Sequence, residues 1–153
     1  MNADKLRFLQ VTFIEKLKQL DAKSERQWGV MNVQQMIEHM SDSVRIANGK
    51  DPQVLLTPAE KMDAMKSFLM SDREFKPNTK NIQMPETALP VRLNDKEEAI
   101  AELQLELRDF VNHFTNNPDA RVMNPFFGNL NFEEWIQLLH KHAVHHLKQF
   151  GSN

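Results

Sequence analysis

The segment "NFEEWIQLLHKHAVHHLKQFG", residues 131–151, predicts the helix that decides the fold. Asn131 followed by Glu134 has the pattern of a capping box at a helix start, and Gly151 is the residue type that commonly ends a helix. Between these positions the apolar residues return at helical spacing. Four of the chain's six histidines lie in the same segment. This helix must therefore present several imidazoles on faces that differ in exposure.

The helical turn of about 100° per residue decides which of these histidines face inward. His142 and His146 are about 40° apart and share the stripe of Trp135, which should face the core. His145 falls at the edge of this stripe. His140 falls on the opposite face, which we expect to be exposed to solvent.

Two histidines four residues apart on a helix can both reach one divalent metal ion, for which neutral imidazole is a good ligand. An isolated pair of this kind more often reflects two partly buried histidines that hydrogen-bond to carbonyls or water. A third histidine, His39, lies on the inward stripe of a helix predicted over residues 33–48. It could equally be a core histidine bonded to a serine or a carbonyl. We expect His39, His142 and His146 to form a metal site between two facing helices.

The rest of the chain predicts further helices. Capping patterns precede three of them, and the expected cap residues are Asn32, Thr57 and Asn94, each with Glu or Gln three residues later. The N-terminal stretch places leucine and phenylalanine on one stripe between residues 6 and 20. No alternation of apolar and polar residues is long enough to predict a sheet.

Two stretches lack a helical period. Residues 71–93 contain three prolines and predict a long crossover connection, and "NPFFGNL", residues 124–130, is a second irregular piece. The predicted fold is an all-α four-helix bundle with one long crossover connection and a short accessory helix after Thr57. A length of 153 residues suits a single domain over residues 1–153.

Composition and charge narrow the classes of partner. The formal net charge is −2 and no stripe of Lys and Arg offers a phosphate footprint, so we expect no nucleic-acid partner. No run of 18 apolar residues predicts a membrane span, and the start "MNADKLRF" lacks the pattern of a signal peptide. A cytoplasmic location and a small-molecule substrate are the expectations that follow.

Residues near the predicted ligands could assist chemistry. Asp42, three positions after His39, is the candidate general base, although a solvated aspartate on a helix flank is the commoner situation. Glu38 lies about 100° further round the helix and is a weaker candidate. His113 has no partner at ligand spacing and is expected at the surface. Expected hydrogen-bond partners of the rings, and aromatic residues below or beside the site, are Ser43, Gln149, Trp28, Trp135, Phe126 and Phe127.

Two stretches, "WGVMNVQQMIEHMSDSVRIANG" (28–49) and "NPFFGNLNFEEWIQLLHKHAVHHLKQFG" (124–151), resemble the DinB/YfiT-like superfamily of metalloenzymes, in a branch of unassigned function. The resemblance implies a four-helix bundle and one divalent metal ion, often Ni or Zn, on three histidines. It maps the ligands to His39, His142 and His146, with His145 as an extra histidine. It also implies pairing as dimers, and relatives that are S-transferases for low-molecular-weight thiols or a mycothiol-dependent isomerase.

Three neutral imidazoles leave coordination positions open on a divalent ion, as in catalytic metal sites. A bound water could hydrolyse an ester, amide or thioester. A bound thiol could attack an electrophile, and the thiol would come from a small cofactor because the chain has no cysteine. The expected function is thus a metal-dependent transferase or hydrolase. The alternatives are a metal-binding sensor or small-molecule carrier without turnover, and a helical scaffold whose imidazoles are merely buried.

Overall fold

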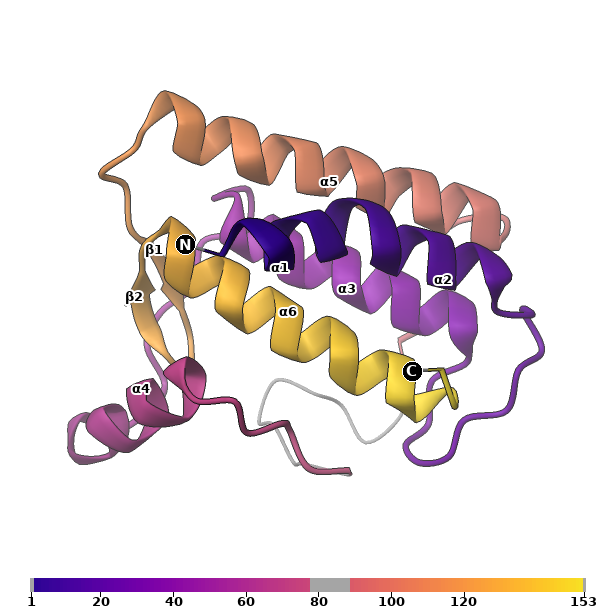
Figure 1. Cartoon of the computed structure of the whole chain (residues 1–153), viewed down its shortest axis with the longest axis horizontal. Coiled ribbons are helices and arrows are strands. Elements are labelled where there is room, and N and C mark those ends of the chain that lie inside the picture. The colour runs from indigo at the N-terminus through magenta and orange to yellow at the C-terminus, as the bar shows by residue number, and fades with distance from the viewer. Residues whose placement is uncertain (1, 78–88, 153) are drawn as a thin grey trace.

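The structure is a computed structural model that describes residues 2–77 and 89–152, and most of these residues are helical (Figure 1). A π-helical turn, η1 (Phe8–Thr12), joins the first two helices, and a short 3-10 turn, η2 (Ala59–Lys61), precedes the fourth. The α-helices are α1 (Ala3–Arg7), α2 (Phe13–Gln19), α3 (Val33–Ala47), α4 (Met62–Met70), α5 (Lys96–Asn116) and α6 (Phe132–Gln149).

The core lies where the inner faces of the long helices meet. Helix α3 packs along α5 and also contacts α6, while α2 contacts α5 and α1 contacts α6. The apolar stripes expected on these helices are buried, which confirms the helical class. Fully or almost fully buried members of the core are Leu9, Phe13, Leu17, Met36, Met40, Val44, Leu103, Leu107, Phe110, Leu139 and Leu147.

The two helices that carry the predicted metal ligands begin as expected. Asn32 and Asn131 each accept a hydrogen bond from a backbone N–H three residues later, and the side-chain oxygens of Gln35 and Glu134 accept one from the cap's own N–H. Helix α6 ends two residues before Gly151, whose φ of +74° is a left-handed conformation that favours glycine. The helix ends are therefore fixed by local sequence, which sets the position of each histidine along its helix.

Two predicted caps are wrong. Helix α5 is capped by Asp95, whose side chain accepts from the Glu98 N–H, one residue later than expected; Asn94 instead contacts the Glu98 carboxylate. Asp and Asn cap equally well, so adjacent candidates could not be separated by type. Thr57 caps no helix, because its hydroxyl donates to the Phe126 carbonyl at 2.8 Å.

A small antiparallel hairpin corrects the prediction that no sheet forms. Strands β1 (Val122–Asn124) and β2 (Gly128–Leu130) pair Val122 with Leu130 and Asn124 with Gly128. The Asn124 side chain accepts from the N–H groups of Phe126 and Phe127, which closes the turn. Strands of three residues are too short to show an alternating pattern, so the sequence reads as irregular there.

The predicted crossover between α4 and α5 is described at both ends, and its residues 78–88 lie outside the described residues. At the first end, the ammonium of Lys141 on α6 donates to the carbonyls of Ser71 (2.6 Å) and Arg73. At the other end, the buried carboxylate of Glu38 on α3 accepts from the backbone N–H of Arg92 at 2.8 Å. The connection is thus attached to the two helices that carry the histidines.

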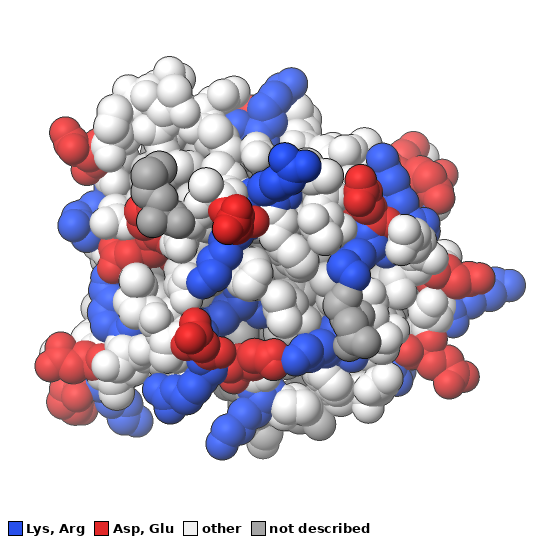
Figure 2. Space-filling model, viewed as in Figure 1, with Lys and Arg blue, Asp and Glu red and all other residues white. Residues whose placement is uncertain are grey.

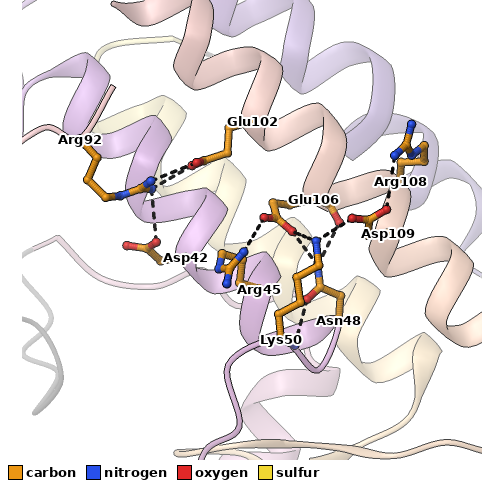
Figure 3. Close-up of polar contacts among 9 residues, drawn as sticks. All are labelled: Asp42, Arg45, Asn48, Lys50, Arg92, Glu102, Glu106, Arg108 and Asp109. Carbon is orange, nitrogen blue, oxygen red and sulfur yellow. Dashed lines mark hydrogen bonds and ion pairs between the residues drawn. The ribbon is translucent and has the colours of Figure 1, made fainter. Parts of the chain in front are cut away.

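A polar network joins α3 to α5. The Glu106 carboxylate is 4% exposed and accepts hydrogen bonds from Lys50 (2.6 Å), Arg45 (3.0 Å) and Asn48 (3.1 Å), as Figure 3 shows. Burial by itself would raise the pKa of Glu106, but these donors hold that pKa below its usual value. The carboxylate therefore stays ionised and fully paired inside the interface.

A second buried charge lies at the C-terminal end of α2. The ammonium of Lys96, at the start of α5, donates to the carbonyls of Leu17 (3.2 Å), Lys18 (3.0 Å) and Leu20. The last carbonyls of a helix have no partner within the helix and carry partial negative charge. Lys96 satisfies them and ties α2 to α5.

Replacing Lys96 with methionine should lower the free energy of unfolding by about 2 kcal/mol, because buried carbonyls lose a charged donor while the apolar volume is kept. Urea unfolding followed by circular dichroism measures the change. The matched control is Lys18→Met, an exposed lysine on the same helix end, which should change stability by less than about 0.5 kcal/mol. Equal effects of the two substitutions would contradict the capping role.

The surface carries charges of both signs. Figure 2 shows lysine and arginine interspersed with aspartate and glutamate over the face in view. Within residues 2–77 and 89–152, no helix has both the length and the apolar character needed to cross a bilayer.

Candidate metal centre

Three imidazoles from two helices meet at one point. The Nε2 atom of His142 on α6 lies 3.0 Å from Nε2 of His39 on α3 and 2.8 Å from Nε2 of His146. One ring nitrogen from each histidine lies within 4.8 Å of the others, so a common point exists within about 3 Å of all three. The predicted convergence of His39, His142 and His146 is confirmed.

Gln149 fixes the orientation and tautomer of His146. The amide of Gln149 donates from Nε2 to the Trp28 carbonyl at 2.9 Å, so its Oε1 is turned toward Nδ1 of His146, 2.7 Å away. An amide oxygen only accepts, and Nδ1 must therefore carry the proton of the neutral ring. The lone pair of His146 is then on Nε2, which faces the other two rings. This contact confirms Gln149 as a hydrogen-bond partner of one of the three clustered rings.

The three rings cannot satisfy one another by hydrogen bonding alone. A neutral Nε2 atom has either one N–H or one lone pair, and the Nε2 atom of His142 faces two neighbours. One of the two contacts is thus left without a good hydrogen bond. A divalent cation within reach of all three nitrogens would use every lone pair, so the donor set fits a metal ion.

Burial keeps these rings neutral. It lowers the pKa of His39 to about 4, with a smaller contribution from nearby His145. It also lowers the pKa of His142 and His146 well below the ordinary value, and their proximity to the other rings adds to the effect. Neutral rings near pH 7 have lone pairs free for a metal.

The remaining histidines lie outside the cluster. His145, at the edge of the inward stripe as expected, lies with its ring centre 5.1 Å from that of His146. His140 is not on a wet face: it is partly buried against Phe8, with ring centres 4.9 Å apart, because the N-terminal helix covers that side of α6. His113 is also partly buried and contacts the ring of Phe114.

Asp42, the candidate base, is paired elsewhere. Its Oδ1 lies 3.5 Å from a guanidinium nitrogen of Arg92, which also binds Glu102 at 2.8 Å (Figure 3). Burial raises the pKa of Asp42, partly offset by Arg92. Glu38 is buried and holds the backbone of residues 92–93. In the described part of the chain, neither carboxylate belongs to the group of three histidines, so a catalytic role for Asp42 stays a prediction.

Of the other residues expected near the site, some contact its histidines or their neighbours and some are engaged elsewhere. Trp28 contacts His145, with ring centres 5.4 Å apart. Ser43 donates to the carbonyl of His39 at 3.2 Å, one turn back on its own helix, and so not to an imidazole. Trp135 is 1% exposed and donates to the Val122 carbonyl of the hairpin. The same hairpin turn holds Phe126 and Phe127.

Phe75 is the neighbour that sequence reasoning missed. Its ring lies edge-on to His142 and His145, with centres 6.4 and 5.9 Å apart. The residue follows α4 in a stretch without helical period, and tertiary contacts, among them those of Lys141 with Ser71 and Arg73, bring that stretch onto α6. No pattern in the sequence indicated this contact.

Comparison with known proteins corrects the resemblance proposed above. Residues 3–153 match the family described as "Protein of unknown function (DUF1569)", and nothing links the chain to the DinB/YfiT-like superfamily. The resemblance rested on histidine spacing in two helices, which unrelated helical proteins can share. Searches of curated proteins and of solved structures found no match. Because the match covers nearly its whole length, the chain belongs to the DUF1569 family of proteins of unknown function.

Proposed function

We propose that this protein is a metal-dependent enzyme in which His39, His142 and His146 hold one divalent ion, Zn²⁺ or Ni²⁺. The convergence of three neutral ring nitrogens carries the proposal. Imidazole suits both ions, and a set of three protein ligands leaves positions for a substrate. We also infer that α1–α2, α3, α5 and α6 form a four-helix bundle, with the site between two of its helices.

The proposed chemistry is the activation of a bound nucleophile. When bound, such an ion would act as a Lewis acid and ionise a bound water or a low-molecular-weight thiol near neutral pH. The chain's own contribution is to hold three lone pairs in place, to fix the His146 ring through Gln149, and to keep the rings unprotonated through burial. A hydrolase and a thiol S-transferase are the two reaction types that this arrangement supports.

A metal-binding protein without turnover is the second candidate. It is favoured by the place of Asp42, which pairs with Arg92 and leaves the cluster without a carboxylate among the described residues. A general base normally accompanies either reaction.

A calorimetric metal titration and an activity screen test the proposal. The protein is expressed without a histidine tag, stripped with a chelator and titrated with Zn²⁺ and Ni²⁺ by calorimetry, and we expect one ion per chain. The loaded protein is then screened for thioester and ester hydrolysis and for thiol conjugation. Binding with turnover supports the enzyme, binding without turnover supports the second candidate, and no binding reduces the protein to a helical scaffold.

Gln149→Leu should weaken Zn²⁺ binding by about 10- to 100-fold, because His146 loses the acceptor that fixes its tautomer. The matched variant is Gln149→Glu, which keeps an acceptor for His146 Nδ1 and replaces the donor to the Trp28 carbonyl with a carboxylate oxygen. It should bind Zn²⁺ within about threefold of the wild type. If both variants weaken binding equally, Gln149 acts through Trp28 and not through His146.

A further inference from the structure

Two aromatic rings contact His145, whose ring adjoins that of His146 in the cluster. Trp28, in the loop before α3, and Phe75, after α4, both contact the His145 ring, and Phe75 also contacts His142. His146 is buried, whereas His39 and His142 each keep some exposed surface. Apolar ring surface therefore adjoins the proposed metal site, at His142 through Phe75 and at His145 through Phe75 and Trp28.

Helix α6 holds both aromatic segments through polar contacts. Gln149 donates to the Trp28 carbonyl, and its own carbonyl accepts from the Gln27 N–H at 2.7 Å. On the other side, Lys141 donates to the carbonyls of Ser71 and Arg73, and Lys148 pairs with Glu74. The two rings are thus fixed relative to the histidines by the same helix, as expected of the walls of a binding site.

The indole of Trp28 has an unused donor. Its Nε1 atom is buried and has no hydrogen-bond partner in the part of the chain that the structure describes. The other tryptophan, Trp135, donates to a backbone carbonyl at 3.1 Å. A buried N–H without an acceptor is unfavourable, and indoles normally find one. An acceptor atom on a bound ligand would satisfy Trp28.

The charge of the proposed centre is uncompensated. Three neutral rings would leave a divalent ion with its full charge, and no carboxylate joins them among the described residues. The nearby acidic side chains are engaged elsewhere, Glu74 with Lys148 and Asp42 with Arg92. Because a partly buried charge without a counter-charge is costly, the ligand that completes the site should bring the negative charge.

We propose that the site binds a small anion that carries an apolar ring. This inference rests on the proposed metal centre. The anionic group binds at the three-histidine centre, the ring lies against Phe75 and Trp28, and an acceptor atom of the ligand receives the Trp28 N–H. Small anions without an apolar body, and neutral or cationic ring compounds, bind less well.

Calorimetry with the Zn²⁺-loaded protein tests this, with benzoate, acetate and benzylamine as probes. Benzoate should bind about tenfold more tightly than acetate, because its ring is removed from water against the two aromatic walls. Benzylamine, which has the ring but a positive charge, should give no measurable binding. Equal affinities of benzoate and acetate, or binding of benzylamine, would overturn the proposal.

Substitutions test the contributions of Phe75 and Trp28 separately. Phe75→Ala should reduce the preference for benzoate while leaving acetate binding unchanged, and Trp28→Phe should weaken benzoate binding by about threefold through loss of the N–H and of part of the ring surface. The control is Phe8→Ala, on the far side of α6, which should keep the full preference. A preference that is undiminished in Phe75→Ala contradicts the proposed wall, and the milder Phe75→Leu, which keeps an apolar side chain, checks that a loss in Phe75→Ala is not caused by misfolding.

Zinc content measured in the same samples distinguishes failure of the proposed metal centre from failure of the proposed ligand class. If the protein binds Zn²⁺ but has equal affinities for benzoate and acetate, the metal centre stands and the proposed ligand class is wrong. A protein that binds no Zn²⁺ refutes the metal centre itself.

Discussion

His142→Ala should weaken Zn²⁺ binding by more than about a hundredfold, since loss of a hydrogen-bond partner behind a ligand already costs about 10- to 100-fold. His142 is the central member of the cluster, and its Nε2 atom lies within 3.0 Å of both other rings. Without it, one ring from each helix remains, and a divalent ion is left with two protein ligands. Calorimetric titration of chelator-treated, untagged protein measures the loss.

His140→Ala is the matched control for this substitution. His140 lies on the same helix, is also partly buried, and contacts Phe8 instead of the cluster. Its removal should leave Zn²⁺ affinity within about twofold of the wild type, since it lies outside both the ligand set and its hydrogen-bond partners. Similar trace metal in wild-type protein and in His142→Ala would reject the metal centre.

The metal-free protein should lose stability as the pH falls from about 6.5 toward 4. The pKa of His39 is lowered from 6.5 in the unfolded chain to about 4 in the fold. Between these values the unfolded chain binds the additional proton, so the free energy of unfolding is highest above pH 6.5 and decreases below it. The full contribution of His39 is about 3 kcal/mol, and His142 and His146 act in the same direction.

Urea unfolding at pH 7, 6 and 5 in the presence of chelator measures this dependence. The window stops at pH 5 because the lowered pKa of Glu106 adds a second loss of stability at lower pH, which begins where the glutamate of the unfolded chain takes up its proton near 4.5. His39→Gln removes one titrating ring and should make the decrease shallower. A wild-type stability that is flat between pH 7 and pH 5 would show that the buried rings are not held neutral.

The parts of the fold that could be predicted are those fixed by local chemistry. Asn32 and Asn131 cap their helices with the expected reciprocal hydrogen bonds, and the stripes between cap and glycine face the core. Since caps and period determine the position and direction of each side chain, His39, His142 and His146 could be placed on inward faces from sequence alone. Their meeting required only that α3 and α6 face each other.

The parts that could not be predicted depend on contacts distant in sequence. Lys96 and Glu106 read as surface charges on a helix, yet each is buried because partners from another segment satisfy it. The π-helical turn η1 has no signature in the leucine stripe that runs through it. The position of Phe75 depends on Lys141, whose partner is a carbonyl about 70 residues earlier.

The attachment of the α4–α5 connection to both α6 and α3 has a consequence for metal uptake. One end is held by Lys141, next to His142, and the other by Glu38, next to His39. The α4–α5 connection therefore holds the two histidine helices in place. The entropy lost in aligning the three rings is lost on folding and not on metal binding. Such preorganisation means that the ion binds to side chains that are already in position. Metal binding should therefore leave the far-ultraviolet circular dichroism spectrum unchanged.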